Sequence, residues 1–445
     1  MTLRTSTSRS LRLLLVCCAG LLAAPGCSAE APEDAAPALS PTENTGDVEG
    51  ALAEGESDFV DPAGALAAAP AACTITVDPA RELVIRALSV VEDPVRTTWT
   101  GGTTNARDGA WTFGRLMTQM AGPNDPQTFV RNWLAKWETP RTVNGFTVPA
   151  RTQIKSQVID PWPKAANGKL DLTKAPMRLL AITNRMDLRN LKAGNAGEGR
   201  FVFGVTDALG NPLQFTVILE YKLPATTAAD VDEWARLWHA LGSQTIGTAA
   251  YNSALQAVTD RFARRDAAPT RPNGSSIGQV RTNEIALSGP WELREFRLGA
   301  NGQLGQATVS QTPDASFNGT ATFAEYVNTN TASILAGKHV VPLKFNGASF
   351  RGGSAPVSGA IWSGPGITSD QARHLVSVNT CNGCHGFGET NTPFLHVRPR
   401  AKGQVAGLSA FLTGEDVTVN GVTRHFDDIA RRRADLVRLL CSAQP

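Results

Sequence analysis

Residues 379–400 read NTCNGCHGFGETNTPFLHVRPR and hold the side chains best suited to chemistry. Cys381, Cys384 and His385 stand at Cys-x-x-Cys-His spacing, and His396 follows eleven residues after His385. In c-type haem proteins, two thiols at this spacing add to the vinyl groups of haem, and the adjacent histidine binds the iron. Cys381 and Cys384 are therefore predicted to attach one haem c, with His385 as an axial ligand.

The second axial ligand is less obvious. Met is usual in proteins of this kind, but the chain has no Met after Met186. His396 is the first candidate, because a loop of eleven residues can reach the far side of the ring, and His425 and His374 come next. Two histidine ligands lower the reduction potential relative to His and Met. An open position would instead allow ligand binding or peroxide chemistry, so the chain is not assigned as an enzyme or a non-enzyme.

Two other chemistries fit the same residues. Cys381, Cys384, His396 and His425 offer the Cys2His2 donor set that suits zinc, although their spacing is not that of a zinc finger. A C-x-x-C pair can also act as a redox dithiol, but the strand-helix context of thioredoxin-like folds is missing here. One-electron transfer by a haem protein is therefore the first hypothesis. A haem-free secreted binding or scaffold protein, its motif braced by zinc or a disulfide, is the second.

The N-terminus predicts export. A positively charged leader precedes an apolar run, Leu13–Ala24, which is shorter than the roughly 20 residues of a membrane-spanning helix and fits a secretion signal. Small residues precede Cys27, as at a bacterial lipoprotein processing site. Residues 1–27 are therefore predicted to be a lipoprotein-type signal peptide with Cys27 acylated. Ordinary cleavage without a lipid is the alternative.

Residues 28–70 form an acidic, Ala/Pro-rich stretch. Ten acidic and no basic residues lie between Ser28 and Asp61, which predicts a disordered tether to an anchor in the bacterial envelope. The whole chain has 42 basic and 40 acidic residues. Without the three leader arginines and these ten acids, 39 basic and 30 acidic residues remain, so the folded body is mildly basic. No basic stripe interleaved with aromatics occurs, so no nucleic-acid partner is expected. The expected contacts are the membrane, through the lipid, and an unidentified redox protein.

Cysteine usage gives one further prediction. Four cysteines follow Cys27, namely Cys73, Cys381, Cys384 and Cys441. Unpaired thiols are uncommon in an oxidising compartment. If the motif uses Cys381 and Cys384, Cys73 and Cys441 remain as a pair that would join the two ends of the folded region, although sequence alone does not fix the connectivity.

The body, residues 71–362, mixes helices and hairpins without regular alternation, which predicts an α+β fold. Two hairpins are predicted, at residues 201–221 and 291–312. Thr227 and Asp230 resemble a capping box at the start of a helix between them.

Residues 363–445 are predicted to form a small all-α, cytochrome c-like haem module. A helix at 367–380, capped by Ser369 or Asp370, would lead into the motif. A helix at 425–440 with one apolar face would end the chain. Two terminal helices crossing over a haem is the cytochrome c arrangement.

Charged residues gather in the segments 184–189 (NRMDLR) and 197–204 (GEGRFVFG). A turn braced by ion pairs is preferred over a buried charge network or a substrate pocket, because no nucleophile or metal-ligand set accompanies them. Arg398, Arg400 and the run Arg431–Arg433 are candidate partners of haem propionates. A solvated helix face is the simpler interpretation of that run.

Four segments, GEGRFVFG, LQFTVILEY, RTNEIALSGPWELREF and NTCNGCHGFGETNTPFLHV, resemble a family of uncharacterised secreted bacterial lipoproteins with a C-terminal C-x-x-C-H motif. The resemblance runs from about residue 84 to the end of the chain. It implies a secreted protein that folds as one unit. It adds little about chemistry, since the family has no established activity.

Overall fold

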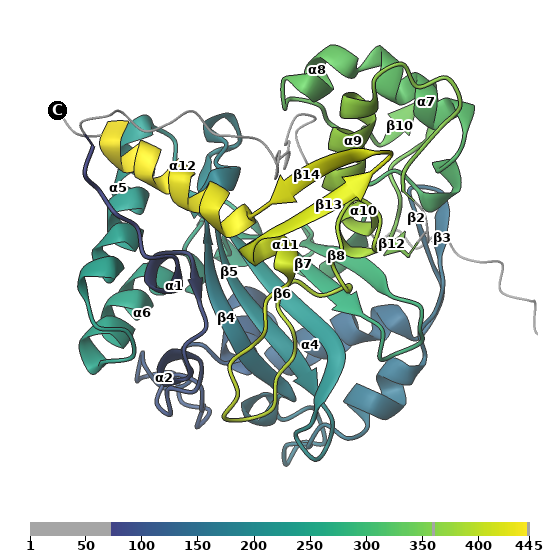
Figure 1. Ribbon diagram of the computed structural model, residues 1–445. Coiled ribbons are helices and arrows are strands. Elements are labelled where there is room, and N and C mark those ends of the chain that lie inside the picture. Colours follow the sequence, from purple (N-terminus) through teal and green to yellow (C-terminus); the bar gives the residue numbers. More distant parts are fainter. Residues whose placement is uncertain (1–72, 358–360, 443–445) are drawn as a thin grey trace, which may run out of the picture. The chain divides into compact units, whose positions relative to one another are not determined.

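The structure is a computed structural model that describes residues 73–357 and 361–442 (Figure 1). The predicted signal peptide with Cys27 and the whole of the predicted tether lie outside these residues. Among the helices described, none combines the length and the apolar character that crossing a membrane requires.

One antiparallel sheet of eight strands dominates this mixed α/β fold. The strand order is β1-β4-β5-β6-β7-β8-β12, and β9 pairs with β8. The predicted hairpins at 201–221 and 291–312 are confirmed as β5–β6 and β8–β9. The strands are β1, Val84–Ile85; β4, Met177–Arg185; β5, Asn195–Thr206; β6, Pro212–Pro224; β7, Ile277–Glu284; β8, Glu292–Leu298; β9, Leu304–Ala307; and β12, Ala355–Pro356.

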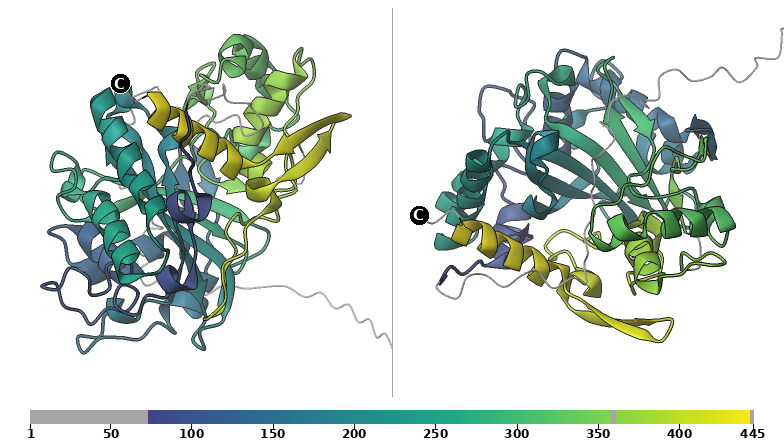
Figure 2. Two further views of the ribbon diagram at one scale, coloured as in Figure 1. Left: turned by 60° about the vertical axis from the view of Figure 1, so that its left-hand side comes forward. Right: turned by 90° about the horizontal axis from the view of Figure 1, so that it is seen from above.

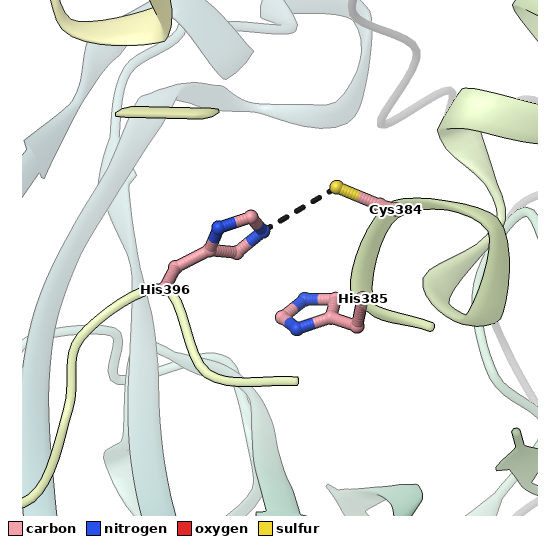
Figure 3. Close-up of side chains that lie close together, drawn as sticks. All are labelled: Cys384, His385 and His396. Atoms are coloured by element: carbon pink, nitrogen blue, oxygen red, sulfur yellow. Dashed lines mark hydrogen bonds between the residues drawn. The ribbon is translucent and has the colours of Figure 1, made fainter. Parts of the chain in front are cut away.

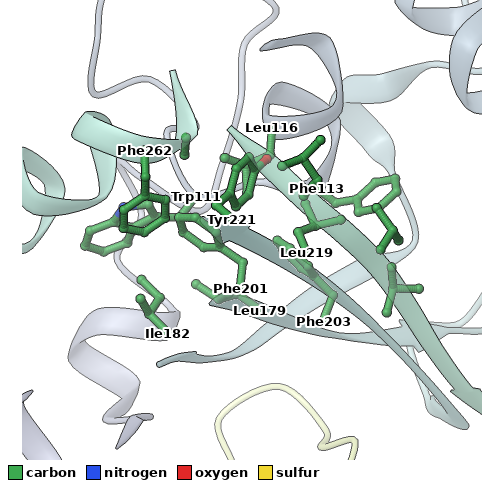
Figure 4. Close-up of a cluster of buried hydrophobic side chains, with 14 of the residues drawn as sticks. Trp111, Phe113, Leu116, Leu179, Ile182, Phe201, Phe203, Leu219, Tyr221 and Phe262 are labelled. Atoms are coloured by element: carbon green, nitrogen blue, oxygen red, sulfur yellow. The ribbon is translucent and has the colours of Figure 1, made fainter. Parts of the chain in front are cut away.

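Helices cover one face of the sheet and bury a large apolar core. Side chains alternate between the two faces of a strand, and Phe201, Phe203 and Tyr221 point to this face. They pack against Phe113 and Phe262 from the helices (Figure 4). The covering helices are α3, Phe113–Ala121; α4, Pro126–Leu134; α5, Ala228–His239, which begins with the predicted capping box; and α6, Ala249–Ala263.

The opposite face of the same strands carries charges. Glu198, Glu220 and Glu295 are fully buried there, between Arg200 and Arg281. The C-terminal part of the chain lies over this face (Figures 1 and 2). Its elements are α9, Asp370–Asn379; α10, Cys381–His385; α11, Ala410–Thr413; β13, Glu415–Val419; β14, Val422–Phe426; and α12, Asp428–Ser442.

Short elements complete the described chain. The hairpin β2–β3 and the hairpin β10–β11 are separate two-stranded sheets. Helices α7 and α8 share a second, smaller core with α9. These elements are α1, Pro79–Glu82; α2, Leu88–Val91; β2, Arg141–Val143; β3, Phe146–Val148; α7, Ala321–Thr329; α8, Thr331–Leu335; β10, Lys344–Phe345; and β11, Ala348–Ser349.

The predicted fold class, α+β with a small all-α cytochrome c-like module at 363–445, is wrong. The region contains the hairpin β13–β14, whose turn residues Asn420 and Gly421 both have positive φ. Asn-Gly between β-branched residues is a strong hairpin signal, and the helical periodicity after residue 425 obscured it. The region is also not a separate helical module, because α9 packs Leu375 into the core shared with α7 and α8, and α12 packs Leu436 into the main core.

The structure joins Cys73 and Cys441 as a disulfide, with their Cα atoms 5.9 Å apart and 368 positions between them in sequence. It ties α12 to the first described residue. Cross-linking so long a loop restricts the unfolded chain strongly.

We predict that the double variant Cys73→Ala/Cys441→Ala loses roughly 2–5 kcal/mol of unfolding free energy, because its unfolded state regains that freedom. Urea unfolding followed by tryptophan fluorescence measures the difference. A reductant should lower the midpoint of the wild-type protein and leave that of the variant unchanged. Equal midpoints for the variant and the oxidised wild-type protein would contradict this role of the disulfide.

Candidate haem or metal site

A cavity of about 220 Å³ lies between the charged face of the sheet and the C-terminal elements. Strands β1 and β4 to β8 supply one wall, and α9 to α12 supply most of the other. Cys381, Cys384, His385 and His396 all line it. The residues predicted to carry the chemistry are thus brought to a single cavity.

The two residues between the cysteines fix the shape of the motif. The backbone N–H of Gly383 donates to Oγ1 of Thr380 (2.9 Å). A Cβ atom at this glycine would lie 2.0 Å from the carbonyl oxygen of Ser377, so no other residue fits the turn. Asn382 accepts a hydrogen bond from Nε1 of Trp362 (2.8 Å). The turn is therefore held from both sides before any ligand binds.

Glu389 braces the motif from the following loop. Its backbone N–H donates to the carbonyl oxygen of Gly383 (3.0 Å). Its fully buried carboxylate accepts from Nδ1 of His374 (2.6 Å) and pairs with Arg373. Thr390 donates to the carbonyl oxygen of Cys384 (2.5 Å). Sequence reasoning missed this role, although an acidic residue four positions after the motif histidine was visible.

His385 is oriented as a metal ligand would be. Its Nδ1 lies 2.6 Å from the carbonyl oxygen of Phe394, which can only accept, so Nδ1 carries the hydrogen and Nε2 keeps its lone pair. The ring stacks on Trp291, with centroids 5.4 Å apart and planes at 14°. Burial, and then the charge of Arg281, lower the pKa of His385 to about 4. Metal-bound histidines commonly donate their second N–H to a carbonyl in this way.

The imidazole of His396 lies beside that of His385 and directs its Nε2 toward Cys384 (Figure 3). Its Nε2 is 3.3 Å from Sγ of Cys384, and its Nδ1 is 2.8 Å from Oγ of Ser409. Burial, and then the adjacent His385, hold the pKa of His396 well below its usual value. Ligand atoms of Cys384, His385 and His396 lie within 4.8 Å of one another, so these three side chains can share one metal ion.

Neither thiol of the motif forms a disulfide, and burial opposes the ionisation of both. Burial raises the pKa of Cys381 to about 11, and it raises the pKa of Cys384 as well. Reactive dithiols need a thiolate and hence a lowered pKa. The geometry therefore argues against the redox-dithiol alternative.

The other predicted ligands lie elsewhere. His425 is exposed on β14 and pairs with Asp416 (2.8 Å). His374 is bonded to Glu389 and does not line the cavity. The predicted Cys2His2 set is thus not assembled among the described residues, because the side chains that come together are Cys384, His385 and His396, without Cys381 or His425.

The charged segments form buried networks rather than a braced surface turn. Asp187 is held by Arg185 (2.8 Å) and by Arg431 from α12 (2.6 Å). Arg200 contacts Glu198 (2.5 Å) within the sheet. The preferred interpretation missed this burial because the partners come from strands and a helix distant in sequence.

The arginines predicted to pair with haem propionates differ in burial and in whether they line the cavity. Arg431 and Arg432 are paired with acids rather than solvated, and Arg432 lines the cavity. Arg433 and Arg398 are exposed. Arg400 is buried against Glu92 and does not line the cavity.

The residues present fit a covalently held haem at His385. Two unpaired thiols face the cavity beside an imidazole whose Nε2 is free to bind iron. Four guanidiniums and two carboxylates line the cavity, and each guanidinium is also paired with a buried carboxylate. His396 fits the second axial position less well, since its ring centroid is only 4.3 Å from that of His385. Two in-line metal–nitrogen bonds of roughly 2 Å put the nitrogens about 4 Å apart and the ring centres farther still.

Comparison with known proteins gives no match, since no family profile fits the chain and no curated protein or solved structure is similar to it at a significant level. The resemblance to secreted bacterial lipoproteins stays a prediction. Function must therefore be inferred from the cavity itself.

We predict that Glu389→Ala lowers the unfolding free energy by roughly 3–5 kcal/mol, because it removes a buried carboxylate from Arg373 and from Nδ1 of His374, leaving Arg373 only Asp370 as an ion-pair partner among the described residues. The matched control is Asp416→Ala, which removes the partner of the exposed His425 and should change stability little. Chemical denaturation of both variants and the wild-type protein provides the comparison. Similar losses in the two variants would show that Glu389 does not brace the motif.

Proposed function

We propose that the protein is an exported c-type haem protein that carries single electrons. Cys381 and Cys384 would hold the haem, and His385 would bind its iron through Nε2. The observation that carries the proposal is the hydrogen bond from Nδ1 of His385 to the carbonyl oxygen of Phe394 (2.6 Å), which directs the other ring nitrogen away from that carbonyl while both thiols line the same cavity. Bound haem would supply a one-electron couple in a largely buried setting.

The protein's own residues would position that group. Trp291 and the Phe394 carbonyl restrain the imidazole, so its orientation would change little between redox states. Arg200 and Arg281 on the sheet, together with Arg432 on α12, supply positive charge for the propionates. His396 is the nearest second histidine and would offer a further nitrogen ligand to that group.

The proposal extends to location and partner. Residues 1–27 would direct export and a lipid on Cys27 would anchor the chain in the outer membrane or at the periplasmic side of the bacterial envelope. The tether at 28–70 would give the body reach. A protein that donates or accepts one electron is then the expected partner, and nucleic acid is not.

A zinc protein is the second candidate, and a specific observation favours it. Cys384, His385 and His396 already place one sulfur and two nitrogens within 4.8 Å of one another. Cys and His are preferred zinc ligands, and three protein ligands would leave one coordination position facing the cavity. Zinc would use Cys384 as a thiolate and would leave Cys381 unused, whereas haem attachment uses both.

We predict that protein made in a host able to mature cytochromes shows a Soret band that survives acid-acetone extraction. A covalent mass increase should appear on the peptide spanning Cys381–His385. Cys381→Ala/Cys384→Ala should abolish the extraction-resistant band, because both thioether bonds are lost. His425→Ala, which changes an exposed histidine outside the cavity, is the matched control and should keep it.

The metal content separates the two candidates. Iron in covalent haem supports the first. One zinc per chain, no iron, and zinc lost in His396→Ala would overturn the haem proposal in favour of the second.

A further inference from the structure

Three buried carboxylates alternate with cations on the charged face of the sheet, and Glu220 is the middle one. Arg200 on β5 and Arg281 on β7 flank it. Glu198 lies beyond the first guanidinium and Glu295 beyond the second. Glu220 thus shares each of its two cations with another acid, whereas the outer carboxylates also have cations of their own.

The outer carboxylates are held firmly in the ionised form. The carboxylate of Glu198 forms ion pairs with Arg200 (2.5 Å) and with Lys222 (3.2 Å). Although burial opposes ionisation, these two cations hold the pKa of Glu198 well below its usual value. Against the same opposition from burial, Arg297 (2.7 Å) and Arg281 lower the pKa of Glu295 to about 2. Neither carboxylate therefore titrates near neutral pH.

Glu220 is held more weakly. Its Oε2 accepts from Gln279 (2.7 Å) and from Arg281 (3.1 Å). Its Oε1 has only a 3.3 Å contact with Nη1 of Arg200 and accepts no hydrogen bond from any described residue. Burial, reinforced by the charge of Glu198, raises the pKa of Glu220 in spite of the two guanidiniums. This oxygen can accept a proton without displacing an existing hydrogen bond.

Of these three carboxylates, Glu220 lines the cavity that also contains Cys381 and His385, whereas Glu198 and Glu295 do not. Burial raises the pKa of Cys381 most, and the charges of Glu295 and Glu220 add to this effect. The ion-pair neighbours of Glu220 within the sheet are Arg200 on β5 and Arg281 on β7, with Glu198 on β5, Lys222 on its own strand and Glu295 on β8 beyond them. The other charged and titratable groups that line the cavity are Arg185 on β4, Cys381, Cys384 and His385 on α10, His396 in the loop that follows, and Asp428 and Arg432 on α12.

We propose that Glu220 is the proton acceptor of the site, so that reduction is coupled to uptake of one proton by its carboxylate. The proposal rests on the proposed haem function. One electron arrives from a one-electron reductant, and one proton arrives from solvent. The proton forms an O–H bond at Glu220 Oε1, so the charge of the cavity is unchanged by the two events together.

Electrostatics gives the direction of the coupling. An added electron makes the cavity more negative, which favours protonation of the carboxylate that is least stabilised as an anion. By linkage, a proton on Glu220 must favour reduction by the same free energy. The reduction potential should then fall as pH rises, by at most about 59 mV for each tenfold drop in proton concentration.

The test is a spectroelectrochemical titration of the haem-loaded full chain across neutral pH. The reduction potential of the wild-type protein should fall with rising pH over a limited pH range, the pH-dependent span. The reduced-minus-oxidised infrared spectrum should also contain a band from a protonated carboxyl group. Glu220→Gln should flatten the span and remove the band. Glu295→Gln is the matched control, since Glu295 does not line the cavity. The protonated carboxyl band should persist in this variant, while the pH-dependent span of the potential moves to lower pH because Arg281 then pairs with Glu220 and no longer with Glu295.

Each outcome decides between the two proposals. A haem-loaded protein with a pH-independent potential and no carboxyl band overturns the role of Glu220 and leaves the haem function standing. Persistence of both signals in Glu220→Gln would also overturn the role of Glu220 and leave the haem function standing, since a haem propionate would then be the proton acceptor. If Glu220→Gln does not fold, the two wild-type signals still decide whether reduction is coupled to a protonated carboxyl group. A protein that binds no haem overturns both proposals.

Discussion

The fold depends on ion pairs between charged side chains that are buried on one face of its main sheet. A buried charge without a partner costs several kcal/mol, so each one must find a counter-charge inside the protein. The strand register provides it, because Arg200 stands opposite Glu220 on β6 and Arg281 opposite Glu295 on β8. A one-residue slip would move these side chains to the apolar face. The charges therefore help to fix the register, and the register places the charges beneath the motif.

The same sheet makes the motif rigid. Trp291, just before β8, stacks on His385, while Phe394 offers its carbonyl oxygen from the loop after α10. Glu389 ties that loop back to α9 through Arg373. One residue distant in sequence, Trp291, and the loop after α10 therefore hold one imidazole in one orientation without help from a bound group. Such preorganisation is what a ligand of a metal or a haem iron requires, because the positioning is complete before the group binds.

Local features were predictable from sequence because local interactions create them. The hairpin β5–β6, the capping box at Thr227 and the cap of α9 at Ser369 all depend on neighbours a few residues apart. The all-α C-terminal module failed because helical periodicity was given more weight than the Asn-Gly turn. The stacking of Trp291 on His385 has no local signal, since 94 positions separate the two residues. The burial of Glu220 likewise becomes visible only when four strands are aligned.

The buried charges also help to rank the chemistries that the motif allows. A buried ion pair rarely stabilises a fold as well as apolar residues of equal volume, so stability alone gives no reason to keep a row of charges under the motif. A zinc ion held by Cys384, His385 and His396 would leave Cys381 unused. A dithiol needs an ionisable thiol, and burial here opposes it. The proposed haem would use both thiols, the imidazole of His385 and the cavity beside them, and for that reason we prefer it to the other two chemistries.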